Sequence, residues 1–455
     1  MRKVLALFCV LLIHQAEAGW RVVKIGRCPT GLLEEVRVAN GRNDGVKRVY
    51  VASAFDGGVY EWTYSGGGWN CVTVHSVGMD MLFVGNGRND GTNRIYAGRG
   101  QRCKCDMTEI TFSSSRWDKQ DVGIDVGPIV GAVLGNGRND EVMRLYIGIE
   151  NGGVYEYTHT GSEWDKLEVS SYGGGTIDIG NGRNDGVSRV YSPAWGDKLY
   201  EFSWTGMSFS SEVIDLLPIG LTAAAIGQGR NDGVNRIYVS ALYKHLYEVT
   251  YTSERWQVVD MTPSGPNRSR YCVRVGKTRS DGKYRVYATT QYGALYEYSW
   301  DGTTWQDSIV VDATTGATAY LDIGSGRNDD TARIYTTNFS TGEVYEITNT
   351  EPYYGIEEKG ENKHQLVKIE SYPNPLTACT GIKIYGIMGS EPLCLWISDV
   401  TGKVIRILPI TNPELPVTKV VWNREDDFGN KVKPGIYFYR LKGKHFTVSK
   451  KVVVI

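Results

Sequence analysis

The sequence predicts an all-β protein, a seven-bladed β-propeller followed by a small Ig-like β-sandwich. Two observations carry this prediction. A short word of Gly, Arg, Asn and Asp returns seven times at intervals of 45 to 50 residues, a period typical of propellers and arrays. Short alternating segments separated by turn residues fill the intervals, and 55 Gly, 29 Tyr and 12 Trp suit many short strands.

The repeated word, called here the Arg-Asn-Asp word, favours a tight turn. Asn, Asp and Gly tolerate a left-handed backbone, and the polar side chains bond to their own backbone. A calcium loop needs alternating oxygen ligands, and the Arg interrupts that alternation in every copy. We therefore expect a turn braced by Arg and Asp, and no metal site. The Arg of the seven copies, of which the sixth is decayed, stands at Arg42, Arg88, Arg138, Arg183, Arg230, Arg279 and Arg327.

Each repeat predicts four strands. The pattern is clearest over 176–214, where four short alternating segments are separated by turns, as in the meander of a propeller blade. The last repeat stops after its third segment, whereas 20–25 matches the fourth segments at 164–169 and 256–261. We expect this N-terminal strand to complete the last blade, so that the ring closes without an open sheet edge.

Residues 1–18 predict a secretory signal peptide. Arg2 and Lys3 precede an apolar run, and Ala16 and Ala18 frame a small-residue cleavage site. The run is too short for a permanent membrane anchor, and no later segment is long enough. We expect a secreted or cell-surface protein without a transmembrane anchor.

Composition argues against several other classes of protein. The net charge of −1 argues against nucleic-acid binding, which needs a basic surface. Seven cysteines remain after the predicted signal peptide, an odd number at irregular spacing, which makes a poor disulfide framework. The pair Cys103 and Cys105 has no second pair at zinc spacing.

The C-terminal part has a different pattern. Residues 349–366 are polar and charged, which predicts a linker, and about ninety residues of short alternating segments follow it. We therefore predict a propeller over 19–348 and an Ig-like domain over 367–455.

Several motifs of this domain occur in a recognisable order. They are Tyr372-Pro373-Asn374-Pro375, Ile397–Gly402, Trp422–Gly429, Pro434–Tyr439 and the terminal Lys450-Lys451 with its Val run. This order resembles the C-terminal sorting domain of the type IX secretion system and the related Ig-like module of flagellar hook-capping proteins. The resemblance implies export across two bacterial membranes, secretion machinery as a partner, and removal or surface attachment of the domain. The alternative is an Ig-like spacer without a sorting signal.

A second repeated pattern joins an Arg of the second strand, a Glu of the third and an aromatic residue eight positions later. An Arg fork and a carboxylate can fix the orientation of a polar ligand, and an indole supplies contact area. The candidate ligand-binding residues are Arg48, Glu61 and Trp69; Arg144, Glu156 and Trp164; Arg189 and Glu201; Arg236, Glu248 and Trp256; and Arg285, Glu297 and Trp305.

This arrangement is similar to the blades of fungal and bacterial fucose-binding propeller lectins. The resemblance implies that the Arg and Glu bond to sugar hydroxyls and that the aromatic residue packs on the apolar face of the sugar. The alternative interpretation is purely structural: the Glu pairs with the Arg on a neighbouring strand, and the Trp packs between blades. The seven-fold repeat and the Arg-Asn-Asp word depart from the six-bladed pattern of those lectins.

The sequence therefore favours a non-enzymatic binding protein without a cofactor, with a glycan or a surface protein as its partner. Multivalent carbohydrate recognition is the most specific form of this prediction, because many weak sites on one ring raise the overall affinity by avidity. The alternatives are a structural or protein-interaction scaffold and, third, an enzyme acting in the central channel. No catalytic residue is predicted, since one Glu per blade does not form a paired-carboxylate site.

Overall fold

The protein is described here by a computed structural model. It describes residues 19–29, 33–54, 57–99, 106–123, 127–150, 152–194, 196–215, 220–241, 245–262, 270–290, 293–313, 320–338, 341–350, 368–385, 393–410, 417–442 and 447–455. The predicted signal peptide and all but the first two residues of the predicted linker lie outside these ranges. Every named element within them is a β-strand, which confirms the all-β class. The chain divides into two compact units, Met1–Tyr353 and Tyr354–Ile455.

Four-stranded antiparallel sheets build the first unit, and we number them by their innermost strands. Among the described residues there are seven, each listed here from the inside outward. They are sheet 1, β2 (Leu33–Ala39), β3 (Arg48–Ser53), β4 (Val59–Ser65), β5 (Gly68–His75); sheet 2, β6 (Met81–Gly85), β7 (Arg94–Gly98), β8 (Met107–Ser113), β9 (Arg116–Asp121); sheet 3, β10 (Ile129–Gly135), β11 (Arg144–Ile149), β12 (Gly153–His159), β13 (Trp164–Ser170); sheet 4, β14 (Asp178–Gly180), β15 (Arg189–Pro193), β16 (Leu199–Trp204), β17 (Phe209–Ile214); sheet 5, β18 (Leu221–Gly227), β19 (Arg236–Ala241), β20 (Leu246–Thr252), β21 (Arg255–Asp260); sheet 6, β22 (Arg270–Gly276), β23 (Arg285–Thr290), β24 (Leu295–Trp300), β25 (Trp305–Val311); and sheet 7, β26 (Leu321–Gly324), β27 (Arg333–Thr337), β28 (Glu343–Asn349), β1 (Trp20–Arg27).

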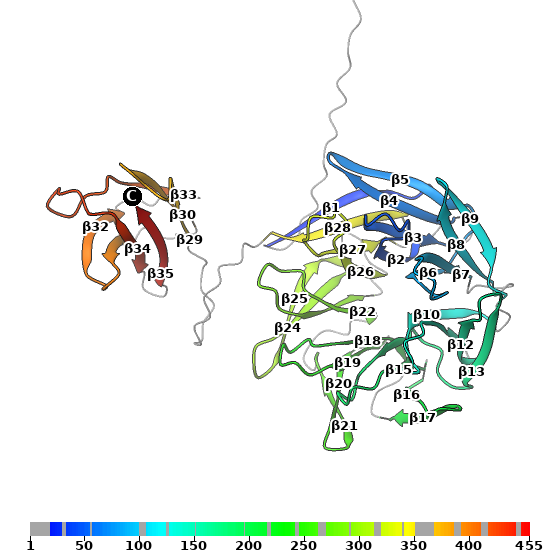
Figure 1. Cartoon of the computed structure of the whole chain (residues 1–455). Coiled ribbons are helices and arrows are strands. Elements are labelled where there is room, and N and C mark those ends of the chain that lie inside the picture. The colour runs from blue at the N-terminus through cyan, green and yellow to red at the C-terminus, as the bar shows by residue number, and fades with distance from the viewer. Residues whose placement is uncertain are drawn as a thin grey trace, which may run out of the picture. The chain divides into compact units, whose positions relative to one another are not determined.

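The innermost strands of these sheets contact one another in a cycle. Strands β2, β6, β10, β14, β18, β22 and β26 touch in this order, and β26 touches β2 again. Figure 1 shows the sheets arranged in a ring. Sheet 7 takes its outermost strand from the other end of the chain, because β1 pairs with β28 from Trp20 opposite Asn349 to Arg27 opposite Glu343. The edge of β28 is thus paired rather than open.

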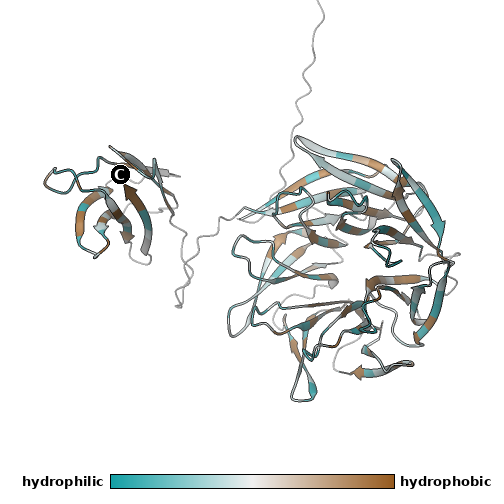
Figure 2. Ribbon diagram, in the orientation of Figure 1, coloured by the Kyte–Doolittle hydropathy of each residue, from teal (hydrophilic) through white to brown (hydrophobic). Residues whose placement is uncertain are grey.

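The core of the first unit lies between neighbouring sheets. The second strand of each sheet has a neighbouring sheet on both faces, and β3 is buried along its whole length. Tyr50 and Val59 of sheet 1 pack with Leu82 and Ile95 of sheet 2 in one such layer. The outermost strands carry both apolar and polar residues, as the hydropathy colours in Figure 2 show. In sheet 1, burial falls from β3 to the outermost strand β5, most of whose residues are exposed.

The Gly of the Arg-Asn-Asp word has a packing role in this core. A Cβ atom on Gly41 would lie only 2.7 Å from the hydroxyl oxygen of Tyr50, so a side chain would displace the ring. In the sixth copy this position is Thr278, whose hydroxyl group instead forms a hydrogen bond with the hydroxyl of Tyr287. The decayed copy thus keeps a contact to the same buried Tyr.

The second unit contains two antiparallel sheets. Ile369 and Trp422 of one sheet and Leu395 and Tyr439 of the other share a single buried core. The sheets are β29 (Lys368–Tyr372), β30 (Thr380–Tyr385) and β33 (Val417–Trp422), and β32 (Val404–Ile410), β31 (Leu393–Asp399), β34 (Gly435–Lys442) and β35 (Thr447–Val454).

Candidate functional site

Each repeat buries one Glu of its third strand and pairs it with the Arg of its own Arg-Asn-Asp word. In sheet 1, Arg42 donates to Glu61 from Nε at 3.0 Å and from Nη2 at 2.5 Å. The Tyr50 hydroxyl donates to the same carboxylate at 2.9 Å, and Glu61 is fully buried. Burial, together with the Glu61 charge, raises the pKa of Tyr50, so the phenol stays a neutral donor. The other pairs are Arg88–Glu109, Arg138–Glu156, Arg183–Glu201, Arg230–Glu248, Arg279–Glu297 and Arg327–Glu346.

The Arg that begins each second strand has a different main partner. The Arg48 guanidinium forks onto Asp44 of the word, with Nη1 and Nη2 at 2.8 and 2.6 Å from the two carboxylate oxygens. Its Nε lies 3.7 Å from Glu61, beyond hydrogen-bond distance. The same fork joins Arg94–Asp90, Arg144–Asp140, Arg189–Asp185, Arg236–Asp232, Arg285–Asp281 and Arg333–Asp329. Two Arg and two carboxylates therefore balance each other within every repeat.

The aromatic residue of each fourth strand packs on the preceding sheet. Trp117 of sheet 2 meets Tyr50 of sheet 1 edge-on, with ring centroids 6.5 Å apart. Arg42 also reaches this interface, and its guanidinium carbon lies 4.3 Å from the ring centre of Phe112. Such pairs add about 1 kcal/mol each beyond the area that they bury. The corresponding pairs are Trp69–Tyr335, Trp164–Tyr96, Phe209–Tyr146, Trp256–Tyr191, Trp305–Tyr238 and Trp20–Tyr287.

The Asn of the word clasps the next sheet. Asn184, with a left-handed φ of 62°, donates from Nδ2 to the Asn235 carbonyl at 3.0 Å and accepts from the Asn235 N–H at 2.7 Å. Asn328 makes the same two bonds to Lys47 and so joins sheet 7 to sheet 1. A Ser stands at this position in the sixth copy, Ser280. The same clasp joins Asn43–Asn93, Asn89–Met143, Asn139–Ser188 and Asn231–Tyr284.

The predicted ligand-binding residues thus have intrachain partners. Each predicted Glu lies within 3.6 to 3.7 Å of its predicted Arg, in the pairs Arg48–Glu61, Arg144–Glu156, Arg189–Glu201, Arg236–Glu248 and Arg285–Glu297. The predicted Trp residues pack on Tyr residues of the preceding sheet instead of joining the Glu of their own repeat. Arg42 and its equivalents are the closer partners and were not predicted from the sequence, although their spacing to the Glu is as regular.

Other site chemistry is sparse in the described ranges. No group of three or more His, Cys, Asp and Glu residues placed to hold a metal ion occurs there. Cys28, Cys71, Cys272, Cys379 and Cys394 are free thiols. Those ranges also hold no helix long and apolar enough to cross a membrane.

Comparison with known proteins supports the fold. No protein-family model matches the chain, and no curated protein matches it. The structure of BBS1N in complex with ARL6DN aligns over 72% of this chain and 97% of its own, at 13% identity and a TM-score of 0.50. At this identity the likeness concerns the fold alone.

Two further solved structures are similar over large parts of the chain. AofleA from Arthrobotrys oligospora aligns over 64% of this chain and 90% of its own, at 19% identity and a TM-score of 0.40. PorZ, a bacterial surface component of the type IX secretion system of Porphyromonas gingivalis, aligns over 96% of this chain and 58% of its own, at 15% identity and a TM-score of 0.42.

The clasp predicts a measurable contribution to stability. Replacing Asn184 by Gly keeps the left-handed backbone but removes both hydrogen bonds, and we expect a loss of about 1 kcal/mol in the free energy of unfolding. Asn184→Ala adds the strain of a Cβ in that conformation and should cost about 1 kcal/mol more. Urea denaturation followed by tryptophan fluorescence measures both. Two variants as stable as the parent chain would show that the clasp is incidental.

The Arg–Asp forks predict a loss of stability in acid. The Arg48 hydrogen bonds lower the pKa of Asp44 to about 2, and those of Arg189 lower the pKa of Asp185 to about 2. A folded-state pKa below the unfolded value of about 3.9 gives stability that is complete above about pH 5 and is lost progressively toward pH 2. Urea midpoints should fall over this range, and less steeply in Asp185→Asn than in the parent chain. Parallel profiles would contradict the assignment.

Proposed function

We propose that this chain is a non-enzymatic binding protein whose first unit is a closed, seven-bladed β-propeller serving as a rigid protein-interaction scaffold. One observation carries the proposal: every repeat holds its buried Glu with its own Arg, as Glu156 is held by Arg138. A carboxylate that is paired with an Arg of its own repeat stabilises the sheet that contains it. The seven sheets and the cyclic contacts of their inner strands support the ring.

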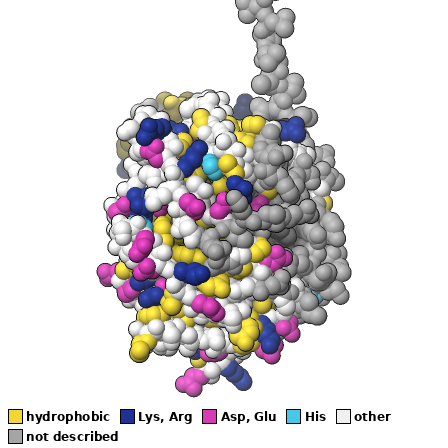
Figure 3. Space-filling model, turned by 90° about the vertical axis from the view of Figure 1, so that its right-hand side faces the viewer, with side chains coloured by type: hydrophobic (Ala, Val, Ile, Leu, Met, Phe, Trp, Pro, Cys, Tyr) yellow, Lys and Arg dark blue, Asp and Glu magenta, His cyan; other side chains and the backbone are white. Residues whose placement is uncertain are grey.

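The proposed partner is a protein rather than a nucleic acid. On the face in Figure 3, Lys and Arg side chains are interspersed with Asp and Glu side chains. Together with a net charge of −1, this mixed surface suits protein recognition by shape and local charge. A rigid ring presents its connecting loops in fixed positions, where binding residues are usually found.

The proposed place of action is outside the cell. The signal-like segment 1–18 and the motifs of 367–455 support export, with the second unit as an Ig-like sorting-type domain. The two sheets and single core of that unit are compatible with a separate module.

Carbohydrate recognition is the second candidate, and one observation favours it. The Arg of the word is partly exposed, 24% for the Arg42 side chain, where it meets the aromatic rings of the next sheet. Comparable stacks form at Arg138, Arg183, Arg230, Arg279 and Arg327. A sugar would have to bind over these guanidinium groups, because the Glu carboxylates beneath them are buried.

A glycan array with the full-length mature chain separates the two candidates. We expect no specific signal from the parent protein or from Trp164→Ala, whose Trp packs against Tyr96. Photo-crosslinking on intact source cells, with the probe at the exposed Met207, should in parallel give discrete protein adducts. A saturable glycan signal that Trp164→Ala weakens in a folded protein, without protein adducts, would instead establish the lectin function.

A further inference from the structure

One register position of the innermost strands differs among the repeats, although the Tyr paired with it recurs. The second strand of every sheet carries a buried Tyr, and the innermost-strand residue paired with it changes from repeat to repeat. These residues are Arg37, Phe83, Val133, Asp178, Ala225, Arg274 and Asp322, paired with Tyr50, Tyr96, Tyr146, Tyr191, Tyr238, Tyr287 and Tyr335. A residue that only stabilised the repeated sheets would be expected to recur in every repeat.

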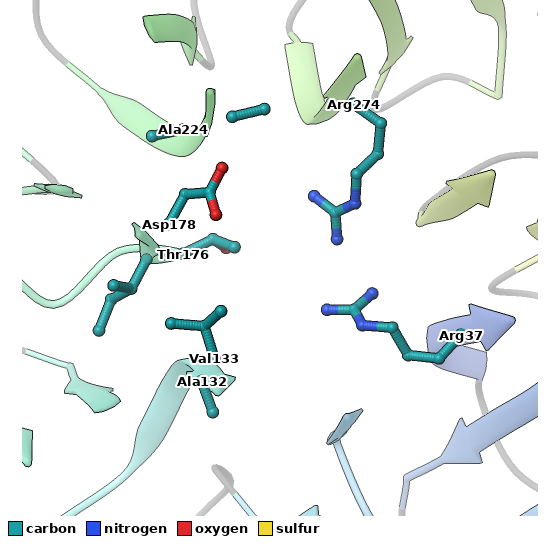
Figure 4. Close-up of a pocket in the computed structure, with 9 residues that line it drawn as sticks. Arg37, Ala132, Val133, Thr176, Asp178, Ala224 and Arg274 are labelled. Carbon is teal, nitrogen blue, oxygen red and sulfur yellow. The ribbon is translucent and has the colours of Figure 1, made fainter. Parts of the chain in front are cut away.

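Several of these residues line one cavity inside the ring. The cavity has a volume of about 170 Å³, and its polar lining comes from Arg37, Thr176, Asp178 and Arg274. Figure 4 shows the guanidinium groups of Arg37 and Arg274 on one side and the Asp178 carboxylate on the other. A cavity of roughly 150 Å³ holds a benzene molecule, so this one has room for a small organic ligand.

The carboxylate of Asp178 is held in place by the backbone. The Ile179 N–H donates to Oδ1 at 2.9 Å, and the Ile226 N–H of the neighbouring sheet donates to Oδ2 at 2.7 Å. These bonds fix the direction of the carboxylate and use one lone pair on each oxygen. The remaining acceptor sites are available to a donor placed in the cavity.

The guanidinium groups opposite are only partly engaged. Nη1 of Arg37 pairs with Glu35 and donates to the Val36 carbonyl at 2.9 Å. Nη1 of Arg274 likewise donates to the Val273 carbonyl at 2.9 Å. The nearest carboxylates to the other Arg274 nitrogens, on Glu35 and Asp322, lie 4.0 Å away among the described residues, too far for hydrogen bonds.

The two walls of the cavity carry opposite charges. The Arg274 side chain is 19% exposed, and its Nε and Nη2 are donors available to a ligand in the cavity. A simple anion would satisfy the two Arg residues but meet the Asp178 charge, and a simple cation would meet the two Arg charges. A ligand with opposite charges at its two ends complements both walls.

We propose that this channel cavity binds a small zwitterion of the amino-acid class. The carboxylate of the ligand binds the Arg37 and Arg274 forks, and its ammonium group binds Asp178. Its side chain packs against the apolar wall that includes Val133 and Ala224. This binding site goes beyond the scaffold function and does not depend on it.

Isothermal titration calorimetry of the full-length chain tests the proposal with a matched set of probes. The set comprises the amino acids from glycine to leucine, together with 3-methylbutanoate and 2-methylpropylamine, which are valine without its amino group and without its carboxylate. We expect saturable binding of at least one amino acid with one site per chain. The amino acid of best fit should bind at least tenfold more tightly than either truncated analogue.

Two variants assign the site. Asp178→Asn keeps one acceptor oxygen, enough for one of the two backbone N–H groups. The folded variant should weaken amino-acid binding at least tenfold and leave 3-methylbutanoate binding equal or tighter. Arg274→Gln should weaken both, and Arg274→Lys serves if the Gln variant does not fold. Arg116→Gln, at an Arg side chain that is 76% exposed, is the control and should bind like the parent chain.

Three results would overturn the proposal. The first is the absence of saturable binding by every amino acid to a folded parent chain. The second is amino-acid binding that Asp178→Asn and the Arg274 variants leave unchanged. The third is equal affinity for valine and for 3-methylbutanoate, which would mean that Asp178 does not recognise the ammonium group.

Discussion

A carboxylate buried in each sheet must be paired, and the repeated features of the first unit follow from this constraint. Glu61 and its equivalents have little or no contact with solvent, where an unpaired charge would cost several kcal/mol. Hydrogen bonds from an Arg guanidinium and, in most repeats, from a Tyr hydroxyl offset that free-energy cost. The same Arg extends across the interface to aromatic rings of the next sheet. The turn that supplies this Arg also supplies the Asn that clasps the next sheet. One short turn therefore connects burial within a sheet to contact between sheets.

The fold was more predictable from the sequence than the site. The period of the Arg-Asn-Asp word and the alternating segments sufficed for the all-β class, because each repeat needs the same turn and the same buried Tyr. The partner of each Glu was harder to predict, since Arg42 and Arg48 both stand at nearly constant spacing from Glu61. Only the folded structure shows that Arg42 is the one that forks onto Glu61. The cavity residues Arg37, Asp178 and Arg274 lie far apart in sequence, and only the ring brings them together.

The contrast between repeated and non-repeated residues suggests how function is distributed over the molecule. Residues that repeat, such as Glu156, maintain the ring, and residues that differ at equivalent register, such as Asp178, are free to acquire chemistry of their own. A scaffold function uses the loops and the outer surface, whereas a small ligand would occupy the channel. Both depend on a frame that does not rearrange, because fixed walls keep a binding site preorganised.

The most direct measurement is the free energy of unfolding of Glu156→Gln compared with Glu168→Gln. Both variants remove one negative charge from sheet 3, but Glu156 is buried against Arg138, whereas Glu168 is exposed on β13. Urea denaturation should show a loss of about 3 kcal/mol for Glu156→Gln, because Arg138 and Arg144 lose their shared counter-charge. The Glu168→Gln variant should change by no more than about 0.5 kcal/mol. Equal stability of the two variants would contradict the view that the repeated Arg and Glu residues hold the frame together.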